Sequence, residues 1–180
     1  MHMLALLTFL CSLIGVGESL WPIPRQLKTG NTPLKLSRNL QIIVDGDAPT
    51  IPEDLLGAIS RTRQHLRSDK FERLVVGRSS ADSHLIEDAS ELDSLILSLP
   101  HGSEMGTIAS EVTKSIDSRS ESYTLAVPTH GQARLISNSS LGLFRGLNTF
   151  EQLWYSKGEE KYLLSAPIEI VDEPAFVSGL

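Results

Sequence analysis

Residues 138–154 read NSSLGLFRGLNTFEQLW, and they predict the helix around which the domain is built. An apolar stripe recurs at i, i+4, i+7 and i+11, a spacing that puts its members on one helical face: Leu143, Leu147, Phe150 and Trp154. Residues 138–140 offer side-chain oxygens that can cap the start of the helix, and Lys157-Gly158 is typical of a helix end. We therefore expect one face of this helix to be buried.

An apolar extended run follows the helix. Tyr162-Leu163-Leu164 and then APIEIVDEPAF, residues 166–176, are bounded by prolines and predict a strand. The helical run LFRGLNTFEQL, residues 143–153, together with this strand closely resembles the end of the N-terminal domain of the eukaryotic β-N-acetylhexosaminidases, glycoside hydrolase family 20. The resemblance extends over residues 20–176.

The resemblance implies a fold and a function. In that family the N-terminal domain is an α+β sandwich whose topology is similar to the zinc metalloproteases but without the metal, and it leads into a catalytic (β/α)8 barrel. The barrel carries an Asp-Glu pair and removes terminal non-reducing N-acetylhexosamine from glycosides, chitin oligomers or glycoproteins, with the substrate acetamido group as nucleophile. Here residues 177–180 read VSGL where the family continues toward its substrate-binding arginine. We therefore expect this chain to be truncated before the barrel and inactive alone.

The rest of the chain predicts an α+β fold. Along the chain we expect an edge segment that packs Trp21 under the sheet, a turn at 30–33, neighbouring strands 34–36 and 40–44, a helix at 52–67, strands 74–77 and 94–99, and a hairpin of 123–127 with 133–136. The helix at 52–67 should bury one stripe, namely Leu55, Ile59, Thr62 and Leu66. Residues 78–90 are expected to be an irregular excursion and residues 101–119 a long loop. These elements favour a mostly antiparallel or mixed sheet with two main helices packed on one face.

The length and composition of the chain are consistent with a single globular domain. It has 180 residues, 41% of them apolar and 21% charged, whereas a barrel alone needs about 250 residues. The formal net charge of -6 argues against a nucleic-acid partner, which would select a basic face. Arg61, Arg63 and Arg67 form the nearest basic cluster, and we expect them on the solvated face of a helix.

The first 17 residues are expected to be a signal peptide. Residues 3–17 are almost uninterruptedly apolar, and cleavage near Gly17 would export the chain, to the outside of the cell or alternatively to a vacuole or lysosome. The segment has no Lys or Arg before its apolar core, which leaves an uncleaved anchor open as the alternative. The single cysteine, Cys11, lies inside it, so the mature chain would hold no disulfide and no cysteine metal site.

Paired carboxylates are the first chemistry to consider, because glycoside hydrolysis usually needs two of them. Asp172-Glu173 and Glu159-Glu160 are adjacent pairs, and neighbours in an extended chain point to opposite faces, so neither pair should converge on one bond. His84 and Glu87 lie three positions apart, but the segment is not convincingly helical, and we expect surface residues rather than metal ligands.

The remaining polar candidates also favour structural roles. His65, His101 and His130 have no evident nucleophile partner. Arg145-Gly146 could be a sugar-binding arginine, but its place inside a helix favours packing, with the glycine permitting a close approach to the sheet. We predict no catalytic, substrate-binding, metal or cofactor residue. Asn138-Ser139-Ser140 is a glycosylation sequon, so Asn138 is the one predicted modification site, although Asn138 could equally be a helix cap.

The predicted organisation is a signal peptide at 1–17, a hexosaminidase N-terminal domain at 18–176 and a tail at 177–180 outside the resemblance. The leading hypothesis is a non-catalytic domain whose partner is the barrel of the parent enzyme. The alternative is a stand-alone exported module that docks on a separate barrel chain or on itself as a homodimer, through residues 168–171 and the face near Leu143 and Trp154. A third interpretation takes residues 177–180 as the product of a missed splice site.

Overall fold

The computed structural model describes residues 20–45, 51–73, 79–100 and 105–173. Within these residues one six-stranded mixed sheet has the order β1-β2-β4-β3-β6-β5. The strands are β1 (Gln26–Asp45), β2 (Ser90–Ser98), β3 (Tyr123–Val127), β4 (Gly131–Ser137), β5 (Tyr155–Lys157) and β6 (Glu160–Asp172). The helices are α1 (Glu53–Ser68), α2 (Ser79–Glu87), α3 (Ile108–Val112) and α4 (Ser140–Gln152), with a 3-10 turn at Ile116–Ser118.

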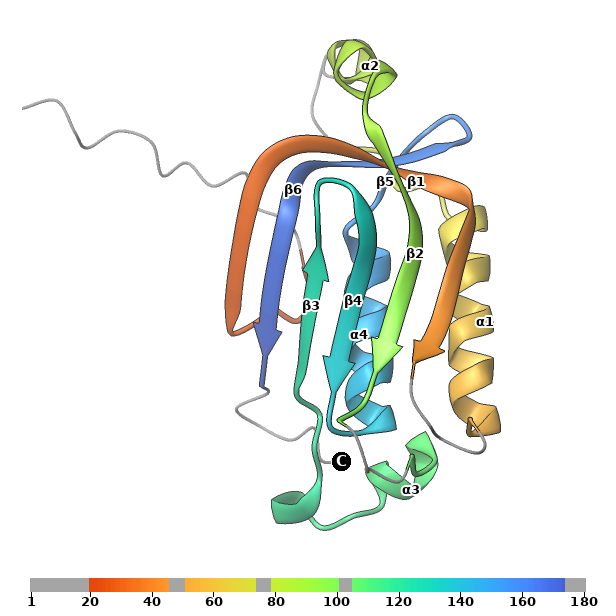
Figure 1. The fold of residues 1–180 in the computed structure, drawn as a ribbon, viewed down its shortest axis with the longest axis vertical. Helices are drawn as coiled ribbons and strands as arrows, with labels where there is room; N and C mark the ends of the chain where they lie inside the picture. The colour runs from red at the N-terminus through yellow and green to blue at the C-terminus, as the bar shows by residue number, and fades with distance from the viewer. Residues whose placement is uncertain (1–19, 46–50, 74–78, 101–104, 174–180) are drawn as a thin grey trace, which may run out of the picture.

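Strand β1 forms both edges of the sheet. Its N-terminal part, residues 26–36, pairs antiparallel with β6, and its C-terminal part, residues 34–45, pairs parallel with β2. In Figure 1 β1 runs up one side of the sheet, arches over the top and descends the other side. One row of register partners spans the sheet from edge to edge: Leu27, Ile170, Leu125, Leu135, Leu97 and Val44. The four central members are fully buried, so this row is the apolar floor on which the helices pack.

Residues 34–36 and 40–44 are confirmed as strand, but both belong to β1 and are not two neighbouring strands, and the turn predicted at 30–33 is wrong. The register with β6 shifts between Thr29 and Thr32 and again before Leu34, so the turn-like residues make an irregularity inside a strand. A Cβ on Gly30 would lie 2.3 Å from the carbonyl oxygen of Ala166. Glycine is needed here because the two strands approach closely.

Helices α1 and α4 cover one face of the sheet, as predicted, and both lie on the far side of the sheet in Figure 1. The predicted stripe of α1 is buried in full, from Leu55 to Leu66. The helix begins after Pro52, and two carboxylates stand in its first turn, where they complement the positive end of the dipole. His65 of α1 donates to the Glu151 carboxylate of α4 at 3.0 Å and joins the two helices.

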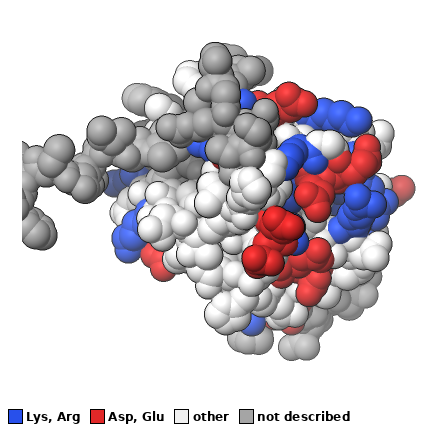
Figure 2. Space-filling model, turned by 90° about the horizontal axis from the view of Figure 1, so that it is seen from above, with Lys and Arg blue, Asp and Glu red and all other residues white. Residues whose placement is uncertain are grey.

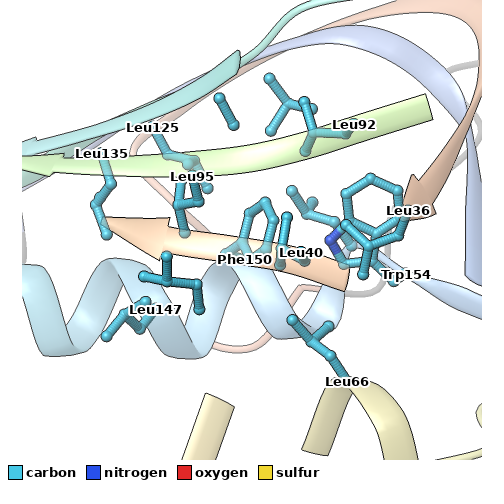
Figure 3. Packing of buried hydrophobic residues seen from close by; sticks show 14 of the residues in the cluster. Leu36, Leu40, Leu66, Leu92, Leu95, Leu125, Leu135, Leu147, Phe150 and Trp154 are labelled. Atoms are coloured by element: carbon cyan, nitrogen blue, oxygen red, sulfur yellow. The ribbon is translucent and has the colours of Figure 1, made fainter. Parts of the chain in front are cut away.

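The stripe of α4 is the centre of the core. Leu143, Leu147 and Phe150 are fully buried, and Trp154, just past the helix, is 2% exposed. Figure 3 shows Leu147, Phe150 and Trp154 facing leucines of the strands, and the rings of Phe150 and Trp154 meet edge to face at 5.6 Å. Since residues 168 and 170 are also buried, the apolar docking surface predicted at 168–171 and near Leu143 is wrong: most of it is the interior of this domain.

The start of α4 agrees with the prediction, and its C-terminal end does not. Ser139 caps the helix, because its hydroxyl accepts from the N–H of Gly142 at 3.0 Å. The helix ends at Gln152, five positions before Lys157, and Gly158 lies instead in the turn between β5 and β6 with φ of 59°. The predicted strand after it is confirmed as β6, and the hairpin of β3 and β4 is confirmed with Gly131 at φ of 88°.

Three local expectations are wrong, and one cannot be placed. Residues 79–87 form α2 rather than an irregular excursion, and residues 101–119 contain α3 and the 3-10 turn rather than only loop. Trp21 is not packed under the sheet: the residue is 79% exposed, while Leu20 is buried. The strand predicted at 74–77 lies outside the described residues. None of the helices in the described ranges is both long and apolar enough for a membrane span.

Candidate functional site

The two predicted carboxylate pairs lie at opposite ends of β6. At the C-terminal end Asp172 accepts from the backbone N–H of Arg25 at 3.2 Å, and Glu173 binds the guanidinium of the same arginine at 2.7 Å. At the other end Glu159 lies 3.7 Å from Lys70, and Glu160 is exposed. The first pair is thus held by one arginine, the second pair lies at the exposed start of β6, and the two pairs do not meet.

Asp172 borders a buried polar cluster. The hydroxyl of Tyr123 lies 2.6 Å from that of Thr149, which joins β3 to α4. Burial raises the pKa of Tyr123 to about 12, and the negative charge of Asp172 acts in the same direction. A phenol that stays protonated in this way can hydrogen-bond but is a weak proton donor at neutral pH, so the cluster favours a structural role.

The histidines lie apart from one another. His84 and Glu87 are exposed on α2; the segment is helical, contrary to the sequence interpretation. The Glu151 carboxylate, which accepts a hydrogen bond from His65, raises the pKa of that imidazole. His130 lies 3.1 Å from the hydroxyl of its neighbour Thr129, and His101 is outside the described residues. Within the described ranges no three or more His, Cys, Asp or Glu side chains are grouped to hold a metal ion.

Arg145 is engaged inside the domain. Its Nε and Nη2 both lie 2.9 Å from one carboxylate oxygen of Glu121, whose side chain is 4% exposed. Arg119 approaches the other oxygen at 3.8 Å, so two arginines neutralise one buried carboxylate. The next residue, Gly146, faces the sheet, and a Cβ there would lie 2.2 Å from Cδ1 of Leu135. This is the close helix-to-sheet approach expected from the sequence.

Asn138 is exposed in the bend between β4 and α4. The capping role that it could have taken belongs to Ser139, and Ser140 is fully buried. The Asn138 side chain is therefore open to solvent, as a glycosylated asparagine must be.

One feature that sequence reasoning missed is a basic pocket, which we define by its nine lining residues: Leu36, Ser37, Arg38, Leu40, Arg63, Leu66, Arg67, Glu159 and Lys161. Its volume is about 210 Å³, and it lies between the bend of β1, the last turns of α1 and the β5–β6 turn. Figure 2 looks onto this end of the molecule and shows Lys and Arg side chains gathered on one side among acidic ones. Only two of its four cations lie in the basic cluster seen in the sequence, since the fold supplies the others.

The cations of the basic pocket are held in place to different degrees. Arg63, which was expected on a solvated face, is half-buried and donates to the carbonyl of Ile42 at 2.7 Å. Lys161 donates to the hydroxyl of Ser156 at 2.6 Å and to the carbonyl of Asp69, and burial lowers its pKa. The pocket is therefore a defined part of the fold.

Comparisons with known proteins agree with the sequence resemblance. A family model described as beta-acetyl hexosaminidase like matches residues 20–153. A beta-hexosaminidase of Arthroderma benhamiae is 28% identical over 140 residues, and the match covers 70% of this chain and 21% of that protein.

Solved structures share the fold. The chitobiase of Flavobacterium johnsoniae superposes with a TM-score of 0.56 at 19% identity, over 88% of this chain and 21% of that one. The structure of CpGH84B gives 0.50 at 20% identity, over 89% and 23%. The chain thus spans about a fifth of the length of the relatives that it matches.

Proposed function

This chain belongs to the beta-acetyl hexosaminidase-like family as the N-terminal domain of glycoside hydrolase family 20 hexosaminidases, and from that premise we propose that it is the non-catalytic supporting domain of a larger β-N-acetylhexosaminidase. The larger enzyme would remove terminal non-reducing N-acetylhexosamine, and its catalytic (β/α)8 barrel would be the partner of this domain. The family match over residues 20–153 carries the proposal, together with the finding that the matched segment is only 21% of the Arthroderma benhamiae relative.

The contacts of the titratable groups support a non-catalytic role. Arg25 holds both carboxylates at the end of β6, Arg145 neutralises Glu121, and His65 joins α1 to α4. Each group serves to connect two segments of the domain. A general acid and base, by contrast, must face one substrate across a distance of about 5 to 10 Å.

We further propose that the chain is exported and glycosylated. Residues 1–17 would be the signal peptide, and Asn138 would carry the glycan, which its exposure at the bend before α4 allows. Expression in a glycosylating host should give a mass that falls on enzymatic deglycosylation. The mass of the Asn138→Gln variant should not change on deglycosylation. If the mass of the parent chain does not change on deglycosylation either, the proposal is contradicted.

A domain exchange tests the supporting role. The 180-residue chain alone should not turn over a chromogenic N-acetylglucosaminide. In a second experiment, residues 20–173 of this chain replace the matching N-terminal segment of the Arthroderma benhamiae relative. The exchanged enzyme should remain soluble and active, whereas deletion of that segment should reduce both the yield of soluble enzyme and its activity. Turnover by the 180-residue chain, or an undiminished deletion variant, would refute the proposal.

A further inference from the structure

We propose that the basic pocket binds a small oxyanion of the phosphate class, either free phosphate or the phosphate group of a monoester. This inference does not depend on the proposed supporting role, because it rests on the pocket itself. Four cationic side chains line it against a single carboxylate, Glu159. That carboxylate also lies 3.7 Å from Lys70, which offsets its charge.

Two arginines of the pocket are available to a ligand. Neither Arg38 nor Arg67 makes a hydrogen bond or ion pair with another residue of the described ranges. Arg63 uses Nη2 on the carbonyl of Ile42, which leaves most of its five N–H donors free. The guanidinium fork matches two oxygens of a phosphate at once, and such charge-assisted pairs are stronger than neutral hydrogen bonds.

The pocket has more cationic side chains than the dipole of helix α1 can explain. Cations near a helix C-terminus are stabilised by its dipole, an effect confined to the last turn, and this accounts for Arg67. It does not account for Arg38, which comes from β1, or for Lys161, which comes from β6. Three separate segments therefore converge their positive charge on one hollow.

The size and floor of the pocket indicate the ligand class. Leu36, Leu40 and Leu66 are buried beneath the charged rim, and a low-dielectric floor strengthens the attraction of the rim for an anion. A volume of about 210 Å³ is smaller than the ~300 to 1,000 Å³ typical of drug-sized ligands. This volume is large enough for one tetrahedral oxyanion with part of its hydration.

Binding can be measured on the 180-residue chain by phosphorus NMR and calorimetry, with inorganic phosphate in one arm and glucose 6-phosphate in the other. Arg38→Gln and Arg67→Gln should each weaken binding about tenfold, and rising chloride should weaken it further. Arg61→Gln is the matched control, because Arg61 is an exposed arginine of the same helix that does not line the pocket. Glu159→Gln should strengthen binding, since it removes the opposing charge.

The two arms identify the source of the phosphate. Equal affinities would show that free phosphate is a sufficient ligand. Tighter binding of glucose 6-phosphate would show that the ligand is a phosphate monoester. Both results support the proposal. The proposal is overturned if neither ligand binds to the parent chain. It is equally overturned if Arg61→Gln weakens binding as much as the pocket variants, or if Glu159→Gln leaves the affinity unchanged.

Discussion

Gly142, the third residue of α4, provides the sharpest test of how closely this helix sits on the sheet. A Cβ at this position would lie 2.0 Å from the hydroxyl oxygen of Ser137 and 2.5 Å from the backbone carbonyl oxygen of Ser122. The Ser137 hydroxyl donates to that same carbonyl at 2.7 Å and accepts from the N–H of Ser139, the helix cap, at 3.2 Å. Gly142→Ala would thus push a methyl group into the hydrogen bonds that seat the start of α4.

Three terms set the size of the effect on the free energy of unfolding. Overpacking a rigid site costs about 1 to 3 kcal/mol, because a backbone carbonyl cannot rotate away as a side-chain end can. The disturbed bond from Ser137 to Ser122 adds about 1 kcal/mol. Replacing glycine by alanine in a helix returns at most about 1 kcal/mol. We therefore expect Gly142→Ala to destabilise the domain by about 2 kcal/mol.

Urea unfolding followed by far-UV circular dichroism measures this difference. With a slope of about 2 kcal/mol per molar, the midpoint should fall by roughly 1 M. Gly57→Ala in α1 is the matched control: the nearest atom to its new Cβ is Nη1 of Arg61 at 3.5 Å, an ordinary contact, so stability should be unchanged or rise by up to about 1 kcal/mol. If the two variants shift the midpoint equally, the close approach at Gly142 is refuted.

Three further measurements probe other parts of the domain. Glu151 raises the folded-state pKa of His65, so this pair stabilises the fold below about pH 6.5 and the contribution is lost as pH rises through the raised pKa. His65→Gln should therefore cost a few tenths of a kcal/mol at pH 5.5 and nothing at pH 9, and equal losses at both would contradict the assignment. The Tyr123 phenol should titrate near pH 12 in ultraviolet absorbance, with stability lost between about pH 10 and 12; an unchanged high-pH component in Tyr123→Phe would disprove it. With Trp21 exposed and Trp154 buried, Trp21→Phe should leave blue-shifted fluorescence that acrylamide quenches poorly, whereas Trp154→Phe should leave red-shifted, easily quenched emission.

The helices that cover the sheet could be predicted because the apolar pattern that specifies each helix lies within its own stretch of sequence. The stripes on α1 and α4 repeat every three or four residues, and burial follows the repeat from Leu55 to Leu66 and from Leu143 to Phe150. The hairpin of β3 and β4 is equally local, with its glycine at the turn. The family resemblance was carried by two segments only 13 positions apart.

The features that escaped prediction depend on contacts between distant segments. Helix α2 is short and weakly periodic, yet its Asp82 is 3% exposed because Arg73 and the hydroxyl of Tyr162 reach it at 3.2 and 3.0 Å. Gly30 looked like a turn residue because nothing nearby in the sequence reveals the approach of Ala166. The basic pocket likewise needs β1, α1 and β6 together. Tertiary packing overrode local propensity in each case.

Strand β1 supplies both edges of the sheet. During synthesis on the ribosome, its two parts therefore become able to pair with their partner strands at different times. Residues 41–45 can pair as soon as β2 has emerged, but Lys28 meets its partner Glu169 only 141 positions later. Until then residues 26–29 are a strand with unsatisfied backbone groups, and loop closure over such a distance is slow. A nascent chain stalled before β6 would therefore present an open, aggregation-prone edge, which makes the arrival of β6 the event that completes the domain.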